Sequence, residues 1–174
     1  MITSEQAKYL IELPKLIIEG EKILGEKTFS PPDPLQDRLY MVSEEDNDFS
    51  FFWVIDQRSK NSIKFTLHYQ EEDANIGLLR IDYNGRHKNP EIANENVPEL
   101  IKPFAGIWLD EYPGHIHFVI DGYEPLKWAI PLELDSFPIK NIINYTDIID
   151  ALKAFAKKIN LRTNLQINAQ TKML

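Results

Sequence analysis

The sequence contains no cysteine among its 174 residues. This absence excludes disulfides, thiolate zinc sites, iron–sulfur clusters and a cysteine nucleophile. Glycine is scarce, at seven residues, and no glycine-rich phosphate-binding loop occurs. Apolar runs are only a few residues long, and the first residues lack the basic and apolar regions of a signal peptide. We therefore expect a cytoplasmic protein with no membrane-spanning segment.

Basic residues are in the minority, with 19 Lys and Arg against 27 Asp and Glu, for a formal net charge of -8. All the acidic side chains lie in residues 1–150, whereas residues 151–174 carry only basic charges, the last of them on Lys172. An acidic surface repels nucleic-acid phosphates within a Debye length, roughly 8 Å at physiological salt. Nucleic-acid binding would therefore need a local positive pocket or the C-terminal segment.

The length and the pattern of apolar residues predict a single domain of the α+β class. Apolar residues recur at helical spacing near both ends of the chain, and strict alternation marks strands between them. We expect a mostly antiparallel, twisted sheet with the N-terminal and C-terminal helices packed on one face. The predicted parts of the domain 1–174 are an N-terminal helical segment (1–25), an antiparallel sheet (38–130) with a long loop (86–113), and a C-terminal helix (146–160).

Turn signals complete this outline. Thr3 and Gln6 form a capping-box pattern at the start of the first helix. Asp121 and Gly122 predict a tight hairpin turn between the last two strands of the sheet. Residues 161–168 are expected to add a short edge strand.

Polar side chains share a face on three of the predicted strands, because successive residues of a strand point to opposite sides. If the apolar sides of these strands face one core, the polar sides must converge as well. The long loop begins directly after one of these strands and adds further polar groups to its end. The converging strand residues are Lys64, His68, Arg80, Asp82, His115 and His117, and the loop residues are Arg86, His87 and Asn89.

This constellation fits phosphoryl transfer without a cofactor. Two imidazoles can serve as general base and acid, and a guanidinium can stabilise the charge of the transition state. RNA supplies its own nucleophile, the 2′-hydroxyl group. In this hypothesis His115 and His117 exchange protons, with His87 as a third candidate, while Arg80 holds phosphate and Asp82 orients a partner. The expected substrate-binding residues are Arg86, Asn89, His68 and Lys64.

Two other interpretations stay open. His115 and His117, together with His87 and Asp82, have the nitrogen and oxygen ligands that a divalent transition metal requires. Alternatively, the chain is a non-enzymatic interaction module whose acidic surface binds a basic protein, and the polar face is an ordinary solvated surface.

The order of motifs resembles an uncharacterised family of small bacterial and prophage proteins. The resemblance rests on Arg-x-Asp (80–82), His-x-Asn-Pro (87–90), His-x-His (115–117) and Trp-Ala (128–129). The sequence also distantly resembles TumE-like toxins of toxin–antitoxin systems. That resemblance implies a toxin-type ribonuclease with a cognate antitoxin as partner. It places functional residues at Arg80, Asp82, His87, His115 and His117.

Overall fold

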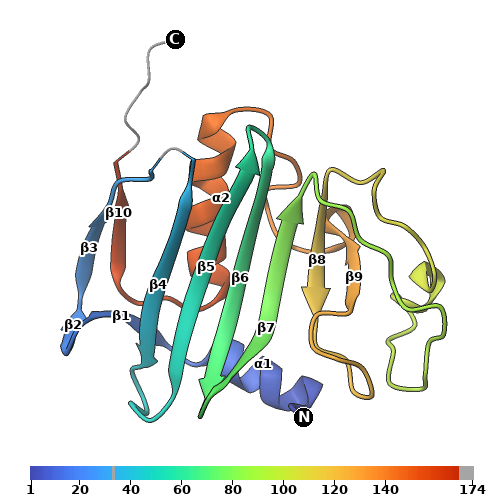
Figure 1. The fold of residues 1–174 in the computed structure, drawn as a ribbon, viewed down its shortest axis with the longest axis horizontal. Coiled ribbons are helices and arrows are strands. Elements are labelled where there is room, and N and C mark those ends of the chain that lie inside the picture. Colours follow the sequence, from blue (N-terminus) through green and yellow to red (C-terminus); the bar gives the residue numbers. More distant parts are fainter. Residues whose placement is uncertain (33, 169–174) are drawn as a thin grey trace.

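The structure is a computed structural model that describes residues 1–32 and 34–168, so Lys172 lies outside the described residues. The predicted α+β class is confirmed, since a mostly antiparallel sheet is accompanied by two helices (Figure 1). No helix in the described part of the chain is long and apolar enough to cross a membrane. The elements are α1 (Ser4–Glu12), β1 (Lys15–Glu19), β2 (Lys22–Leu24), β3 (Glu26–Phe29), β4 (Gln36–Ser43), β5 (Ser50–Ser59), β6 (Ser62–Glu71), β7 (Ala74–Tyr83), the 3-10 helix η1 (Lys102–Phe104), β8 (Gly114–Phe118), β9 (Trp128–Pro131), the 3-10 helix η2 (Leu132–Leu134), α2 (Tyr145–Lys158) and β10 (Asn164–Ile167).

The main sheet has eight strands in the order β2-β1-β4-β5-β6-β7-β8-β9, and each neighbouring pair is antiparallel. Strands β4 to β9 follow their order in the chain, as expected for consecutive hairpins. β10 pairs with β3 in a separate, parallel, two-stranded sheet. The C-terminal strand predicted within 161–168 is therefore present, and its partner comes from the N-terminal part of the chain.

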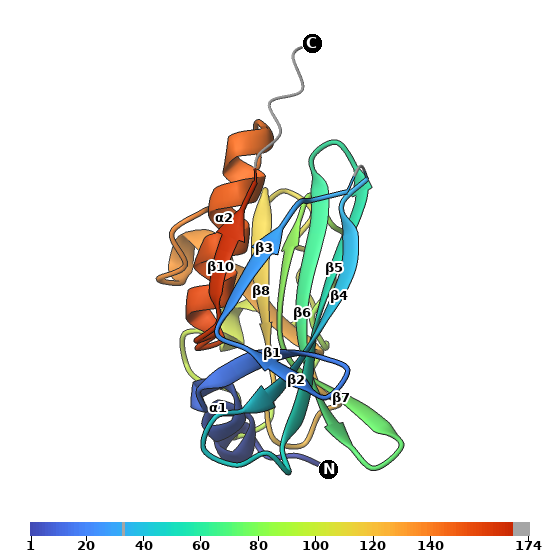
Figure 2. The ribbon, with the colours of Figure 1, turned by 90° about the vertical axis from the view of Figure 1, so that its left-hand side faces the viewer.

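Alternation along the long strands gives the main sheet two different faces. On one face the fully buried rings of Trp53 and Phe65 pack on Phe155 of α2, with ring centroids 5.1 Å and 5.5 Å away. Figure 2 shows α2 alongside this sheet. The opposite face, here called the open face, carries the even-numbered residues of β4, β5 and β6 and, after the register shift of β7, Arg80 and Asp82.

The prediction of a helical segment over 1–25 is wrong after its first half. The capping box of Thr3 and Gln6 is present, and α1 then ends at Glu12. Residues 15–24 form the β1–β2 hairpin instead. The apolar residues of this stretch fit either period, but Gly20 has φ +59° in the two-residue turn and lets the chain reverse.

Lys15 closes the fold between the two helices. Its side chain is fully buried, and its ammonium donates hydrogen bonds to the carbonyl oxygens of Ile11, Leu13 and Ile159 at 2.9, 2.8 and 3.0 Å. The ammonium also lies 4.7 Å from the ring centre of Phe51. Because the last carbonyls of a helix have no partner within it, one lysine here satisfies the ends of α1 and α2 together.

Two connections differ in how well they were predicted. The segment between β7 and β8 has no strand and contains only η1, so it is the long irregular loop expected at 86–113. A tight turn is present at Asp121 and Gly122, where the N–H of Tyr123 donates to the carbonyl of Ile120 at 3.2 Å. The prediction that it joins the two strands as a hairpin is wrong, because nine residues separate β8 from β9. Nδ2 of Asn94, in the long loop, donates to the carbonyl of Asp121 at 3.0 Å, so the long loop contacts the connection between β8 and β9.

Candidate functional site

The register of the sheet brings the predicted cluster together on the open face. Lys64 lies opposite Asp82, and Asp82 lies opposite His115. In the next row Arg80 lies opposite His117. The convergence of Arg80, Asp82, His115 and His117 that the alternation predicts is therefore present.

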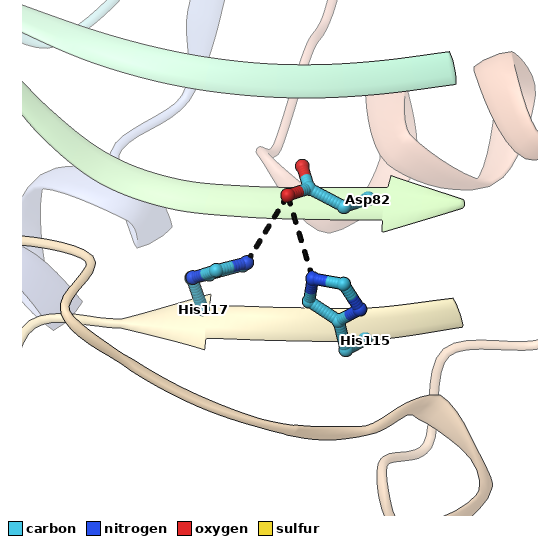
Figure 3. A group of neighbouring side chains, drawn as sticks. All are labelled: Asp82, His115 and His117. Carbon is cyan, nitrogen blue, oxygen red and sulfur yellow. Dashed lines mark ion pairs between the residues drawn. The ribbon is translucent and has the colours of Figure 1, made fainter. Parts of the chain in front are cut away.

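Asp82 is the centre of this cluster, as Figure 3 shows. It is only 3% exposed, and its Oδ2 lies 3.2 Å from Nε2 of His117 and 3.4 Å from Nε2 of His115. Its other oxygen, Oδ1, lies 3.2 Å from Nε of Arg80. Both imidazoles are fully buried, whereas the side chain of Arg80 keeps 22% of its exposure. Arg80 is therefore the member of the cluster that reaches solvent.

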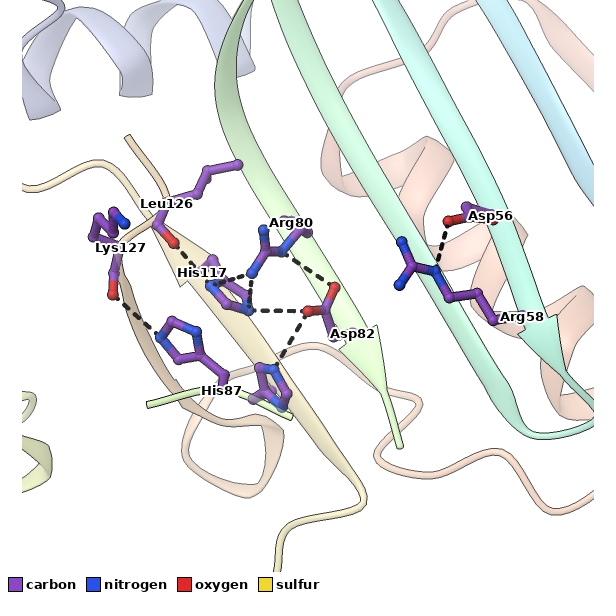
Figure 4. Close-up of polar contacts among 9 residues, drawn as sticks. Asp56, Arg58, Arg80, Asp82, His87, His117, Leu126 and Lys127 are labelled. Carbon is purple, nitrogen blue, oxygen red and sulfur yellow. Dashed lines mark hydrogen bonds and ion pairs between the residues drawn. The ribbon is translucent and has the colours of Figure 1, made fainter. Parts of the chain in front are cut away.

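The protons of His117 can be placed from its neighbours. Nη2 of Arg80 lies 3.0 Å from Nδ1, and the carbonyl oxygen of Leu126 also lies 3.0 Å from it. Because a carbonyl oxygen only accepts, we assign a proton to Nδ1. In the neutral ring Nε2 then has a lone pair, and Nη2 of Arg80 donates to it at 2.9 Å. Figure 4 shows Arg80 bridging His117 and Asp82 in this way. Nε2 of His117 and Oδ2 of Asp82 are both acceptors and lie 3.2 Å apart. The guanidinium of Arg80 places a positive charge beside them.

His87 extends the cluster toward the surface. Its ring centroid lies 4.4 Å from that of His117 and 5.8 Å from that of His115. Nε2 of His87 lies 3.1 Å from Oδ1 of Asn89 and 3.2 Å from the carbonyl oxygen of Lys127 (Figure 4). Because both partners are acceptors, Nε2 carries the proton, and Nδ1 keeps a lone pair.

Asn89 holds this arrangement in place. It is 2% exposed, and its Oδ1 also accepts from the backbone N–H of Ala129 at 2.8 Å. Its Nδ2 donates to the carbonyls of Ala129 and Phe104, at 2.8 and 3.2 Å. The amide is therefore fully used within the protein, and it fixes the orientation of His87 while fastening the long loop to β9.

The electrostatics of the cluster keep the carboxylate of Asp82 charged and the imidazoles of His117 and His87 neutral. Burial alone would raise the pKa of Asp82, but the neighbouring imidazoles of His115 and His117 and the charge of Arg80 outweigh burial and hold that pKa far below its usual range. Burial lowers the pKa of His117 to about 3, against the opposing attraction of Asp82. Burial likewise lowers the pKa of His87, with the charge of Arg80 adding to the effect. His87 is therefore a neutral base at pH 7.

A pocket of about 320 Å³ opens beside the cluster and shares Asp82 as part of its wall. Three cations line it. Arg58 pairs with Asp56 at 3.1 Å, and Arg86 pairs with Asp110 at 3.0 Å. The third is Lys64, which has no carboxylate within ion-pair distance among residues 1–32 and 34–168. The lining residues are Asp56, Arg58, Ser62, Ile63, Lys64, Asp82, Tyr83, Asn84, Gly85 and Arg86.

Of the remaining predicted residues, His68 stands apart from the cluster. Its ring stacks on Phe52, with centroids 4.6 Å apart. Asp56 and Arg58 of the pocket wall were not predicted from the sequence. A signal for Asp56 was available, because Asp56 and Lys64 both occupy even-numbered positions of alternating strands and so lie on one face of the sheet. The carbonyls of Leu126 and Lys127 have no sequence signal, because any residue carries that group.

Three side chains could hold a metal ion. Asp82, His115 and His117 each offer one ligand atom, and these atoms all lie within 4.8 Å of one another. Tetrahedral zinc with bonds of 2.0–2.2 Å separates its ligand atoms by about 3.3–3.6 Å, close to the 3.2 and 3.4 Å measured from Asp82. His87, the fourth predicted ligand, is not part of this compact group.

The protein is thus an α+β domain that carries a buried cluster of arginine, aspartate and histidine side chains beside a charged pocket. The chain belongs to a family of unknown function, DUF6978, whose profile matches residues 2–161. The predicted membership of an uncharacterised family is thus confirmed. Comparisons with curated proteins and with solved structures gave no match. The likeness to TumE-like toxins and the prophage origin stay predictions.

Proposed function

We propose that this protein cleaves phosphodiester bonds in an RNA-type substrate on the open face of its sheet. The observation that carries the proposal is the cation-lined pocket whose wall includes Asp82, the central carboxylate of the histidine cluster. The cations of the pocket therefore lie beside the carboxylate that the histidines of the cluster contact. The chain has a net charge of -8, so such a grouping of cations is a local feature.

The pocket and Arg80 provide the binding of phosphate. Lys64 is a half-buried cation without a carboxylate partner among the described residues, so an anion can pair with it without breaking an existing ion pair. Arg80 is held by Asp82 and His117, and its side chain is 22% exposed. A fixed guanidinium stabilises the charge that develops on the phosphate oxygens in the transition state. We assign His117 and His115, which are buried, to positioning Arg80 and Asp82.

His87 is the imidazole available to a substrate, since it is partly exposed and its Nδ1 has a lone pair. The 2′-oxygen attacks the adjacent phosphorus, its proton passes to Nδ1 of His87, and the bond from phosphorus to the 5′-oxygen breaks. The 5′-oxygen takes a proton from water, and the resulting hydroxide removes the proton from His87. The products are a 2′,3′-cyclic phosphate end and a 5′-hydroxyl end.

Cleavage of a fluorescent single-stranded RNA by the purified protein tests this proposal. His87→Gly should slow cleavage about 10²- to 10⁴-fold, as loss of a general base does. Added imidazole should restore part of the rate, which a merely structural histidine would not allow. A matched strand with deoxyribose at the cleaved position should stay intact. Failure of the wild-type protein to cleave RNA, or equal cleavage of the deoxy strand, would refute the proposal.

The second candidate function is binding of a divalent transition metal. It is favoured by the convergence of Asp82, His115 and His117: Oδ2 of Asp82 lies 3.2 and 3.4 Å from the two imidazole nitrogens, and all the ligand atoms lie within 4.8 Å of one another. Both ring nitrogens of the buried His115 lack a hydrogen-bond partner in the described part of the chain. Binding would require Arg80 to move outward, and its partial exposure leaves it room to do so.

Elemental analysis after dialysis against Zn²⁺ tests this second candidate. One ion per chain is expected, and Asp82→Asn should abolish binding by removing the charged ligand. The matched control is Asp56→Asn, which removes a carboxylate from the same face but outside the convergent group. Absence of zinc from the wild-type protein, or equal binding by both variants, would exclude the metal site.

A further inference from the structure

We propose that the open face binds its RNA in single-stranded form, with one base stacked on Tyr40 and the backbone running across Arg38 toward the pocket. This inference rests on the proposed function, and it names the form of the substrate. Its basis is a row of rings on three adjacent strands, here called the stacking row: Tyr40 of β4, Phe52 of β5 and His68 of β6.

The stacking row is continuous across the sheet. Tyr40 lies opposite Phe52 and Phe52 opposite His68 in the strand register. The centroids of Tyr40 and Phe52 are 6.1 Å apart, and Phe52 and His68 are nearly parallel, with an angle of 12° between their planes. The guanidinium of Arg38 lies 4.8 Å from the centre of the Phe52 ring. Phe52 is thereby covered, whereas Tyr40 remains 48% exposed at the end of the row.

The ring of Tyr40 is tilted by 48° against that of Phe52 and is 48% exposed, so an accessible aromatic ring lies at the end of the row. Nucleic-acid bases stack on such rings regardless of sequence, because every base has a π-face. Duplex RNA keeps its bases stacked inside the helix and cannot use the site. The geometry therefore selects a single strand.

The charges on the same face fit a phosphate backbone. Arg38 of β4 and Lys64 of β6 have no carboxylate partner within ion-pair distance in the residues the structure describes, and Arg80 of β7 is partly exposed. These strands span about 14 Å from β4 to β7, since neighbouring strands lie about 4.8 Å apart. Arg38 and Arg80 both lower the pKa of His68, after the larger effect of burial, which reflects how closely they surround the row. Cations thus lead from the stacking row to the pocket that holds Lys64.

Fluorescence anisotropy with a short, labelled single strand tests this inference. The strand carries 2′-deoxyribose, so that it cannot be cleaved and binding is measured separately from catalysis. Tyr40→Ala should weaken binding about 5- to 150-fold, the loss expected for one stacked base. The matched control is Tyr9→Ala on α1, since Tyr9 is similarly exposed and also contacts a phenylalanine. Tyr9→Ala should leave binding unchanged.

Salt dependence tests the backbone contacts. Lys64→Gln should reduce the slope of log Kd against log salt concentration by about 0.7, the value for one phosphate contact of a single strand. Lys153→Gln, an exposed lysine on α2, is the control and should not change the slope.

The outcomes separate the two proposals. Binding that depends on Tyr40, without any cleavage of RNA, would support this face and refute the nuclease. Cleavage without a Tyr40 effect would refute the stacking site and leave the nuclease standing. Equal affinity for a duplex of the same length would overturn the selection of single strands.

Discussion

The fully buried imidazole of His117 should make the protein lose stability as the pH falls. Burial lowers its pKa to about 3 from an ordinary value of 6.5. Above pH 6.5 the ring is neutral in both the folded and the unfolded chain, and it contributes no pH dependence. Between pH 6.5 and 3 only the unfolded chain binds the proton, so the free energy of unfolding decreases as the pH decreases.

The magnitude follows from the two pKa values. One pH unit corresponds to about 1.4 kcal/mol, so the interval from 6.5 to about 3 corresponds to about 5 kcal/mol. A domain of ordinary stability has only about 5–15 kcal/mol in total. The pKa values of His87 and His68 are also lowered, and their contributions have the same sign. The pKa of Asp82 is lowered as well, but its contribution is lost only below about pH 4, where the unfolded carboxyl is protonated.

Denaturant unfolding at a series of pH values measures this effect. His117→Gln should be less steeply pH-dependent than wild type between pH 6.5 and 4, by nearly 1.4 kcal/mol per pH unit. His68→Gln, the same substitution at a half-buried site, should change the slope less. The wild-type protein offers a test that needs no variant, because its His117 NMR signals should titrate only below about pH 4. A slope unchanged by His117→Gln, or titration of His117 near pH 6.5, would refute the reasoning.

Three further changes have expected outcomes. A Cβ at Gly114 would lie 2.9 Å from a backbone oxygen, so Gly114→Ala should destabilise the protein by about 1–3 kcal/mol, measured by thermal unfolding. Asn89→Ala removes the partner that orients His87, and the His87 NMR signals should broaden or shift while far-UV circular dichroism stays unchanged. Lys15→Met leaves three carbonyls without their donor and should cost about 1–3 kcal/mol in denaturant unfolding; equal stability of the variant would contradict this.

The middle of the fold was predictable because burial there is one-sided. In residues 62–70 every second side chain is apolar, and this fixes both the strand and its faces. The same parity predicted that Asp82 and His117 would share a surface, since strand neighbours on one face must point the same way. For this reason the cluster could be assembled from the sequence before any distance was known.

The parts of the fold that were predicted wrongly depend on contacts between residues far apart in the sequence. The β1–β2 hairpin contains isoleucines at spacings that also suit a helix, and its pairing with β4 decides the outcome. The connection after β8 has the turn that Asp121 and Gly122 predict, but it continues to Lys127, and within it Asn94 from the long loop donates to the carbonyl of Asp121. The complete burial of His115 was equally hidden, because alternation assigns a face and does not show what covers it.

The pairing of β3 with β10 has a consequence for synthesis on the ribosome. Glu26 of β3 pairs with Asn164 in this small sheet, so β3 can pair only after a segment 138 residues further along the chain has been synthesised. At about 5–20 residues per second, translation imposes a delay of roughly 7–28 s. The ammonium of Lys15 likewise gains its hydrogen bond to the carbonyl of Ile159 only after that residue has been synthesised. The nascent N-terminal segment therefore cannot acquire its native environment until residues 159–167 have emerged.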